Sequence, residues 1–230
     1  MEYHAIKITT NEISPYRKII GSNIDPGKRE KIAGLRFQAD RDRALIGAIL
    51  SRTVLCRQLG IGKDELVIDT SPYGKPYVRG ARDFDFNIAH SGSWIVCGAG
   101  QGRLGVDVEK IDEADDGFAK RYFAPQETEL LRSLEAASRK RLFYSIWTLK
   151  ESYIKALGMG LAMSLEGFSM RFQPHGIRAV SQGRDTGFHF RLFQNMDPDY
   201  SFALCSENPP PGTSCVWTLE DLMRNFLRLC

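Results

Sequence analysis

The 230-residue chain lacks the features that mark secreted, zinc-stapled or membrane-spanning proteins. It has only five cysteines, far apart and without a C-x-x-C pair, which argues against a disulfide framework and a structural zinc site. No apolar run approaches the roughly 20 residues that a membrane-spanning helix needs. The first ten residues lack the apolar core of a secretion signal. We therefore expect a cytoplasmic protein with reduced thiols and no membrane contact.

The chain also lacks a large excess of either charge, since 31 Lys and Arg face 28 Asp and Glu. No basic stripe with interleaved aromatic residues occurs, so we expect no nucleic-acid partner. Any basic site must be local. A content of 43% hydrophobic and 26% charged residues is ordinary for a soluble globular protein. The length suits one large domain or two small ones packed together.

Apolar periodicity predicts strands and helices that are mixed without regular alternation, and therefore an α+β fold. We place a break near Gly102 to Asp107, which divides the chain into residues 1–104 and 105–230, with no convincing repeat between them. A polar stretch with the breakers Ser14-Pro15 and Asp25-Pro26 follows the first strand. The expected strands span residues 3–8, 66–69, 84–88, 94–99, 104–109, 168–172, 187–192 and 200–205. The expected helices span residues 40–59, 125–134, 138–157 and 219–229, with a short helix from Pro26.

Two acidic residues alternate with valines in Gly105-Val106-Asp107-Val108-Glu109. On a strand, Asp107 and Glu109 point to one face and the valines to the other. Neighbouring carboxylates repel unless a positive charge lies between them. Mg²⁺ suits this role, because it takes a few carboxylates and leaves positions for substrate phosphates. A solvent-facing strand edge with two charges is the competing interpretation, and for so short a motif alone it is the more common one.

The segment from Phe143 to Gly158 forms an apolar stripe at helical spacing that Lys150 and Glu151 interrupt. A charge in such a stripe is costly unless it is paired or bound to an ion, so Glu151 is a candidate third metal ligand. An i,i+4 pair between Glu151 and Lys155 is the alternative. That pair explains Lys155, but it does not explain an acid among aromatic neighbours. Lysines beside a metal site would suit a pyrophosphate.

Both segments resemble the signature motifs of the 4'-phosphopantetheinyl transferases, the second running from Trp147 to Gly160. The combined pattern is far more specific than either half. The length is that of the large, monomeric type that activates surfactin synthetase and similar assembly lines. Three upstream segments resemble the family's other motifs in the usual order: Pro26-Gly27-Lys28-Arg29-Glu30-Lys31, Tyr73-Gly74-Lys75-Pro76 and Phe86-Asn87-Ile88-Ala89-His90-Ser91-Gly92.

The resemblance implies an enzyme that moves the 4'-phosphopantetheine of coenzyme A onto a serine of an apo acyl or peptidyl carrier protein. Such carriers belong to fatty-acid, polyketide or nonribosomal-peptide synthases. It also implies two similar α+β halves related by a pseudo-twofold axis, with coenzyme A in the cleft between them.

The resemblance further assigns roles to single residues. Asp107, Glu109 and Glu151 would hold Mg²⁺. Lys150 and Lys155 would neutralise the pyrophosphate, and Glu127 aligns with a proposed general base, so that Glu127 and Lys155 are the catalytic candidates. The remaining coenzyme A contacts are Lys28, Lys31, His90 and Arg43 for the 3'-phosphate, and Lys75 and Pro76 for the adenine.

Two departures concern coenzyme A binding. Ala89 and Ala44 stand where relatives have hydroxyl residues, and each loss would cost about 1 kcal/mol. A magnesium-dependent phosphohydrolase and an inactive coenzyme A-binding regulator are the alternative functions, although intact acidic residues argue against the regulator. The proton acceptor, Glu127 or a metal-bound water, stays open, as does the choice between Mg²⁺ and Mn²⁺.

Overall fold

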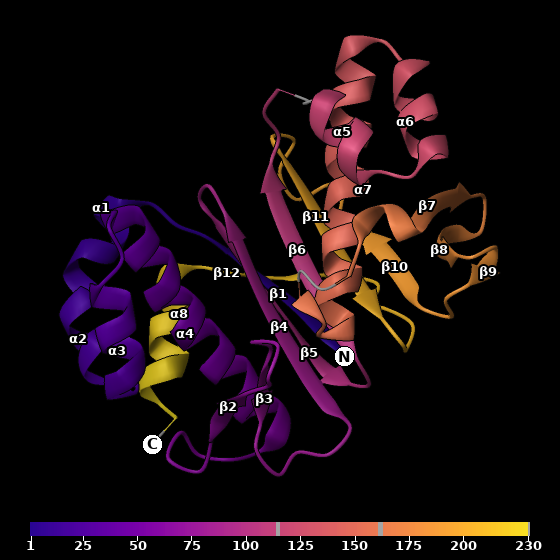
Figure 1. The fold of residues 1–230 in the computed structure, drawn as a ribbon. Helices are drawn as coiled ribbons and strands as arrows, with labels where there is room; N and C mark the ends of the chain where they lie inside the picture. The colour runs from indigo at the N-terminus through magenta and orange to yellow at the C-terminus, as the bar shows by residue number, and fades with distance from the viewer. Residues whose placement is uncertain (114–115, 161–162, 230) are drawn as a thin grey trace.

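The computed structural model describes residues 1–113, 116–160 and 163–229, which form two adjoining sheets, each covered by one long helix (Figure 1). This arrangement confirms the predicted α+β class. The first sheet has the strand order β12 (Cys215–Trp217), β1 (Glu2–Lys7), β5 (Trp94–Gln101) and β4 (Phe84–Ser91). The second has the order β6 (Leu104–Lys110), β11 (Tyr200–Ser206), β10 (His189–Leu192), β8 (Gly176–Ser181) and β7 (Phe168–Gln173), with β9 (Arg184–Asp185) on β8. A small hairpin pairs β2 (Ile68–Thr70) with β3 (Pro76–Val78).

Two helices of 22 residues dominate the molecule, α4 (Gln38–Leu59) on the first sheet and α7 (Ala136–Leu157) on the second. Both end at a left-handed glycine, Gly60 with φ 67° and Gly158 with φ 69°, as a helix C-terminus favours. The shorter helices are α1 (Thr10–Ile13), α2 (Arg17–Ser22), α3 (Pro26–Ala33), α5 (Asp116–Tyr122), α6 (Pro125–Arg132) and α8 (Leu219–Leu227), with 3-10 turns η1 (Ser14–Tyr16) and η3 (Leu165–Gly167). None of the described helices is long and apolar enough to cross a membrane.

The polar stretch after the first strand is helical from Thr10 to Ser22, where the sequence predicted no helix before Pro26. Thr9 and Glu12 form a capping box that starts α1, and Pro15 occupies the first turn of η1, where a missing N–H costs nothing. Buried Ile13 and Ile20 pack these turns against α4. Tertiary packing therefore outweighs the weak helical signal of the sequence.

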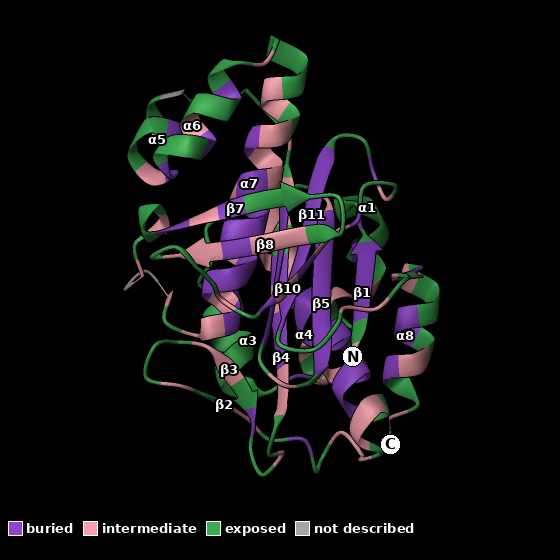
Figure 2. Ribbon diagram, turned by 90° about the vertical axis from the view of Figure 1, so that its right-hand side faces the viewer, coloured by how far each residue is buried: buried purple, intermediate pink, exposed green. Residues whose placement is uncertain are grey.

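Three apolar clusters hold the layers together. One lies under α4 and a second under α7. The third lies between the two sheets, where Val96 of β5 faces Val106 of β6 and Phe202 of β11. The strands between the helices are accordingly the most buried part of the molecule, whereas α5 and α6 are largely exposed (Figure 2).

The C-terminal segment returns to the first sheet. Strand β12 pairs in parallel with β1, and Trp217 Nε1 donates to His4 Nδ1 at 3.0 Å. Helix α8 buries Leu222, Met223 and Phe226 in the cluster under α4. The predicted second half, residues 105–230, is therefore wrong at its end, because residues 215–229 complete the first half.

Candidate active site

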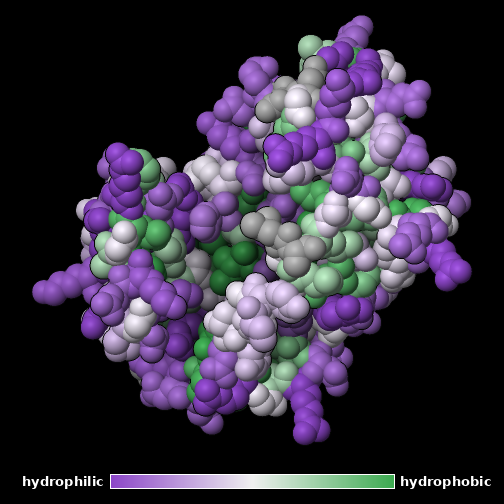
Figure 3. Space-filling model, viewed as in Figure 1, coloured by the Kyte–Doolittle hydropathy of each residue, from purple (hydrophilic) through white to green (hydrophobic). Residues whose placement is uncertain are grey.

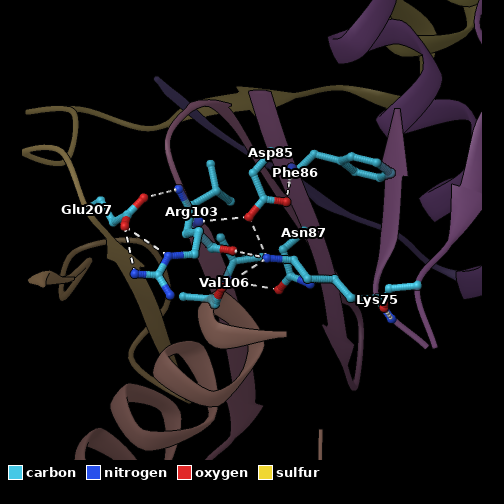
Figure 4. Close-up of polar contacts among 10 residues, drawn as sticks. Lys75, Asp85, Phe86, Asn87, Arg103, Val106 and Glu207 are labelled. Atoms are coloured by element: carbon cyan, nitrogen blue, oxygen red, sulfur yellow. Dashed lines mark hydrogen bonds and ion pairs between the residues drawn. The ribbon is translucent and has the colours of Figure 1, made fainter. Parts of the chain in front are cut away.

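The acidic strand β6 lies next to β4 of the other half, and side chains of β4 take the place of a backbone ladder. Asp85 accepts from the N–H of Leu104 at 2.9 Å, and Asn87 accepts from the N–H of Val106 at 2.9 Å (Figure 4). Lys75 crosses this junction as well: Nζ donates to Asp85 at 2.5 Å, to the Leu104 carbonyl at 2.9 Å and to the Ala156 carbonyl. The junction between the halves is thus polar and well satisfied.

Gly105 determines how close α7 comes to β6. A Cβ at this position would overlap the carbonyl oxygen of Ser152 and the amide nitrogen of Ala156, and would lie 2.9 Å from the carbonyl carbon of Lys155. Only glycine permits this approach of two backbones. Because side chains alternate on a strand, Asp107 shares the helix-facing side of Gly105. The glycine therefore brings α7 down onto the acidic face of the strand.

The close approach places a lysine and three carboxylates together. Lys155 Nζ donates to Asp107 Oδ1 at 2.5 Å. Burial raises the pKa of Asp107 to about 7, although Lys155 opposes the shift, and the negative charges of Glu109 and Glu151 add to it. Burial likewise raises the pKa of Glu151, with a further contribution from Glu109. The three carboxylates therefore interact through space, as expected for groups that share a cation.

A metal ion fits this cluster in part. Among the described residues, no three His, Cys, Asp or Glu side chains converge closely enough to ligate one ion as they stand. Asp107 Oδ2, however, is buried and has no hydrogen-bond partner in the part of the chain that the structure describes. A buried carboxylate oxygen without a partner is costly, and a bound cation would satisfy it. The donors are all hard oxygens, which suit Mg²⁺.

A cavity of about 340 Å³ adjoins the acidic cluster at the boundary between the two halves. Figure 3 shows apolar surface gathered in the hollow on this face of the molecule. Glu151 and Lys155 border the cavity on one side, and Lys75 and Pro76 on another. The ammonium group of Lys75 is engaged at the junction, so only its methylene groups remain for a ligand. The rest of the lining is mainly apolar or glycine, with Tyr73, Ile88, Ile154, Met163 and Leu165.

The predicted phosphate contacts lie on the first half. Lys28 and Lys31 are exposed on α3. Arg43 on α4 donates to the Gly92 carbonyl at 2.9 Å and pairs with Asp40. The pKa of His90 is lowered, first by desolvation and then by the positive charges of Arg43 and Lys155. His90 therefore lies between the basic residues of the first half and the acidic cluster of the second.

The structure disagrees with the expected roles of Glu127 and Lys150. Their side chains are 3% and 0% exposed and form an ion pair of 2.9 Å. Lys150 Nζ also donates to the carbonyls of Leu165 and Phe168, at 2.8 and 2.5 Å. These partners hold the ammonium group of Lys150 inside the core.

Glu127 is enclosed in the same way, because it accepts from the N–H groups of Ala124 and Met170, at 2.8 and 2.6 Å. These partners and the ion pair with Lys150 hold the carboxylate inside the core. The sequence analysis placed Lys150 and Glu151 in the same apolar stripe of the helix. Adjacent residues of a helix, however, point about 100° apart. Of the two, Glu151 is the residue that lines the cavity.

Sequence reasoning missed Ser91 and assigned Ala89 incorrectly. Ser91 Oγ donates to Glu109 Oε2 at 2.9 Å, which ties the first half to the acidic cluster. Ala89 packs in the apolar cluster between the sheets, so a hydroxyl there would face this core and not a cofactor. The alternation of Asp85, Asn87 and Ser91 along one strand face was the available signal for this junction.

Comparison with known proteins identifies the family. The family model described as the 4'-phosphopantetheinyl transferase superfamily matches residues 103–205, and the model of the 4'-phosphopantetheinyl transferase N-terminal region matches residues 14–102. The chain is 34% identical over 203 residues to 4'-phosphopantetheinyl transferase Sfp of Bacillus subtilis, covering 88% of this chain and 91% of that protein. It is 30% identical to the transferase psf-1 of Bacillus pumilus, covering 85% and 84%.

A solved structure of a holo-(acyl-carrier-protein) synthase from Bacillus anthracis, in complex with CoA (3',5'-ADP), is 18% identical with a TM-score of 0.39. It covers 45% of this chain and 92% of that protein. The full-length relatives carry the assignment, because their similarity spans both halves. The chain belongs to the 4'-phosphopantetheinyl transferase superfamily, and within it to the type represented by Sfp.

Proposed function

We propose that the protein transfers the 4'-phosphopantetheine group of coenzyme A to a serine of an apo carrier protein, with the help of Mg²⁺. The observation that carries this proposal is the meeting of Lys155 and Glu151 from α7 with Asp107 and Glu109 from β6, beside a cavity of about 340 Å³. The cavity accepts the apolar and adenine parts of the substrate, and the charged cluster accepts its pyrophosphate.

The reaction exchanges the phosphoanhydride bond of the pyrophosphate for a phosphoester bond to the carrier serine. The serine Oγ of the carrier forms a bond to the β-phosphorus of coenzyme A, and the bond to the bridging oxygen breaks. The leaving group is 3',5'-ADP, and the serine proton passes to solvent or to a neighbouring base. Such chemistry depends on positioning and charge neutralisation more than on covalent catalysis. The nucleophile belongs to the carrier protein.

The residues of this chain supply positioning and charge. Asp107, Glu109 and Glu151 would hold Mg²⁺, which neutralises pyrophosphate charge when bound. Lys155, whose ammonium group lies beside Asp107, would bind a pyrophosphate oxygen. Glu127 is buried and paired with Lys150, so we assign it no proton transfer.

Coenzyme A binding would involve both sides of the cavity. Pro76 and the methylene groups of Lys75 would pack against the adenine. The basic residues of the first half would bind the 3'-phosphate, namely Lys28, Lys31, Arg43 and His90. Replacement of Lys28 by Ala should therefore raise the KM for coenzyme A and leave the KM for dephospho-coenzyme A unchanged.

The proposal extends to partners and setting. Acyl or peptidyl carrier proteins of fatty-acid, polyketide or nonribosomal-peptide synthases are the acceptors. The enzyme works as a cytoplasmic monomer.

A mass measurement tests the function directly. The protein is incubated with coenzyme A, Mg²⁺ and an apo carrier protein, and the carrier is weighed by mass spectrometry. An added phosphopantetheine supports transfer. Hydrolysis of coenzyme A without an adduct would establish a phosphohydrolase, and coenzyme A binding without turnover would establish a regulator.

Two lysines on α7 provide a matched pair of variants. Lys155→Met should abolish transfer, because it removes the ammonium group beside Asp107. Lys140→Met should retain transfer, since the ion pair of Lys140 among the described residues is with exposed Glu113, at 3.1 Å. Equal activity of the two variants would refute the role of Lys155.

A further inference from the structure

Three side chains of β4 accept hydrogen bonds from the backbone of β6, and one of them, Ser91, makes a second contact. Asp85 and Asn87 each accept an N–H of β6, from the residue 19 positions further along the chain. Ser91 continues the row, since its Oγ accepts from the N–H of Lys110 at 3.1 Å. Ala89 occupies the remaining place, opposite Val108, and offers no acceptor. Ser91 is thus the last side chain that fixes β6 before the strand ends.

Ser91 Oγ also donates to Glu109 Oε2 at 2.9 Å. A hydroxyl has one proton, and the N–H of Lys110 approaches its lone pair, so the proton is directed to the carboxylate. Both the main chain of β6 and the carboxylate of Glu109 are therefore tied to one oxygen atom. The side chain of Ser91 is partly buried, which shields this contact from water. Glu109 is consequently held in one orientation relative to Asp107 on the same strand.

We propose that Ser91 is the positioning residue of Glu109, so that one half of the molecule orients a metal ligand carried by the other. The inference rests on the proposed function, because it takes Glu109 as a ligand of a divalent cation. A second contact that orients a ligating carboxylate commonly changes metal affinity by about 10- to 100-fold when it is removed. Ser91 itself touches neither the cation nor the substrate in this role.

Metal affinity measured without a carrier protein tests the inference. Mn²⁺ serves as the probe, and free Mn²⁺ is followed by electron paramagnetic resonance during titration of the full chain. Ser91→Val and Ser91→Thr have the same shape and differ in the hydroxyl group. We expect roughly tenfold weaker Mn²⁺ binding by Ser91→Val and near wild-type binding by Ser91→Thr. The KM for Mg²⁺ in transfer should rise in the valine variant, whereas the KM for coenzyme A should not change.

Ser93→Ala is the matched control in the same turn. Ser93 Oγ contacts the hydroxyl of Tyr200 at 3.2 Å instead of a carboxylate. This variant should bind Mn²⁺ as the wild type does. A lower melting temperature of Ser91→Val with unchanged Mn²⁺ affinity would show a merely structural role and overturn the inference. Absence of Mn²⁺ binding by the wild type would instead overturn the proposed metal centre, which distinguishes the two failures.

Discussion

Helices α4 and α7 have the same length and the same type of C-terminus, yet they approach their sheets differently. A Cβ on Gly47 of α4 would meet methyl carbons of Ile88 and Ile95 at 3.6 and 3.8 Å, which is ordinary contact. On the other half, Gly105 leaves no space for any side chain between β6 and α7. Apolar side chains therefore separate α4 from its strands, whereas α7 touches the strand backbone. The distance between helix and sheet decides which half brings charged side chains together.

The largest difference in activity and stability should come from adding a methyl group at Gly105 and at Gly47. Gly105→Ala places a methyl group against backbone atoms that cannot rotate away, so we expect complete loss of transfer. The free energy of unfolding should fall by about 4 kcal/mol or more. Gly47→Ala should be neutral or stabilising by up to about 1 kcal/mol, because alanine favours a helix. Urea unfolding and the carrier mass assay measure both variants. Equal tolerance of the two substitutions would contradict the difference between the halves.

The next effect concerns buried ion pairs. Lys150→Met leaves Glu127 charged and without its partner in the core, which should cost about 3–5 kcal/mol. Adding Glu127→Gln removes that charge and keeps one carbonyl oxygen for one of the two N–H groups, so part of the loss should return. In the first half, buried Asp42 pairs with partly exposed Arg17. Arg17→Met should therefore lower the free energy of unfolding clearly less than Lys150→Met does. Chemical unfolding of the single and double variants measures the coupling.

The outcome for Glu127 distinguishes structure from catalysis. Glu127→Gln alone should lower stability and retain transfer at temperatures where the variant is folded. Loss of transfer in a fully folded Glu127→Gln variant, with a changed pH profile, would restore the general-base role that the sequence predicted.

Two buried aspartates, Asp107 and Asp42, make contributions to stability that depend on pH in opposite directions. In the metal-free protein, burial raises the pKa of Asp107 to about 7, so the folded state binds a proton more tightly than the unfolded state. Its contribution to stability therefore falls as the pH rises from about 4 to about 7. Burial acts in the same direction on Asp42, but hydrogen bonds from Arg17 and Gln38 outweigh it and lower its pKa. Asp42 therefore stabilises at neutral pH and loses this effect in acid.

Asparagine variants of Asp107 and Asp42 distinguish these two pH dependences of stability. With EDTA present, Asp107→Asn should gain stability over the wild type as the pH rises from about 5 to about 7. Asp42→Asn should be less stable than the wild type across the same range. Unfolding free energies at several pH values measure both differences. A flat difference for Asp107→Asn would argue against an elevated pKa.

The smallest effect should come from the two helix-terminal glycines. Alanine at Gly60 or Gly158 adopts a left-handed conformation at a cost of about 1–2 kcal/mol. A Cβ at Gly60 meets nothing within 4 Å, whereas at Gly158 it would lie 3.1 Å from Lys75 Cδ. Similar losses of stability are therefore expected, but only Gly158→Ala should raise the KM for coenzyme A. Steady-state kinetics and thermal unfolding check the pair.

The sequence predicted the site where the chemistry depends on local pattern. Alternation along β6 put Asp107 and Glu109 on one face, and helical spacing put Glu151 and Lys155 near each other. The structure adds the contact at Gly105 that joins the two elements. This contact depends on the tertiary distance between them, although the glycine itself was visible in the motif.

The errors have equally physical causes. Lys150 interrupts the same apolar stripe as Glu151, and a sequence pattern cannot tell a buried ion pair from a cleft residue. Its partner Glu127 comes from another helix, at long sequence separation. Strand β12 has only three residues and no clear alternation, so its return to β1 was invisible. Long-range pairing of short segments is decided by packing, which no local pattern records.

The return of residues 215–229 to the first sheet has a consequence for folding on the ribosome. These residues are synthesised after the second half, but they supply Trp217, Leu222 and Phe226 to the core under α4. The first sheet therefore stays incomplete, with an open edge along β1, until the whole second half has been synthesised. Such an exposed edge invites premature pairing. Nascent chains that stall between the two halves should consequently depend on chaperones more than the finished protein does.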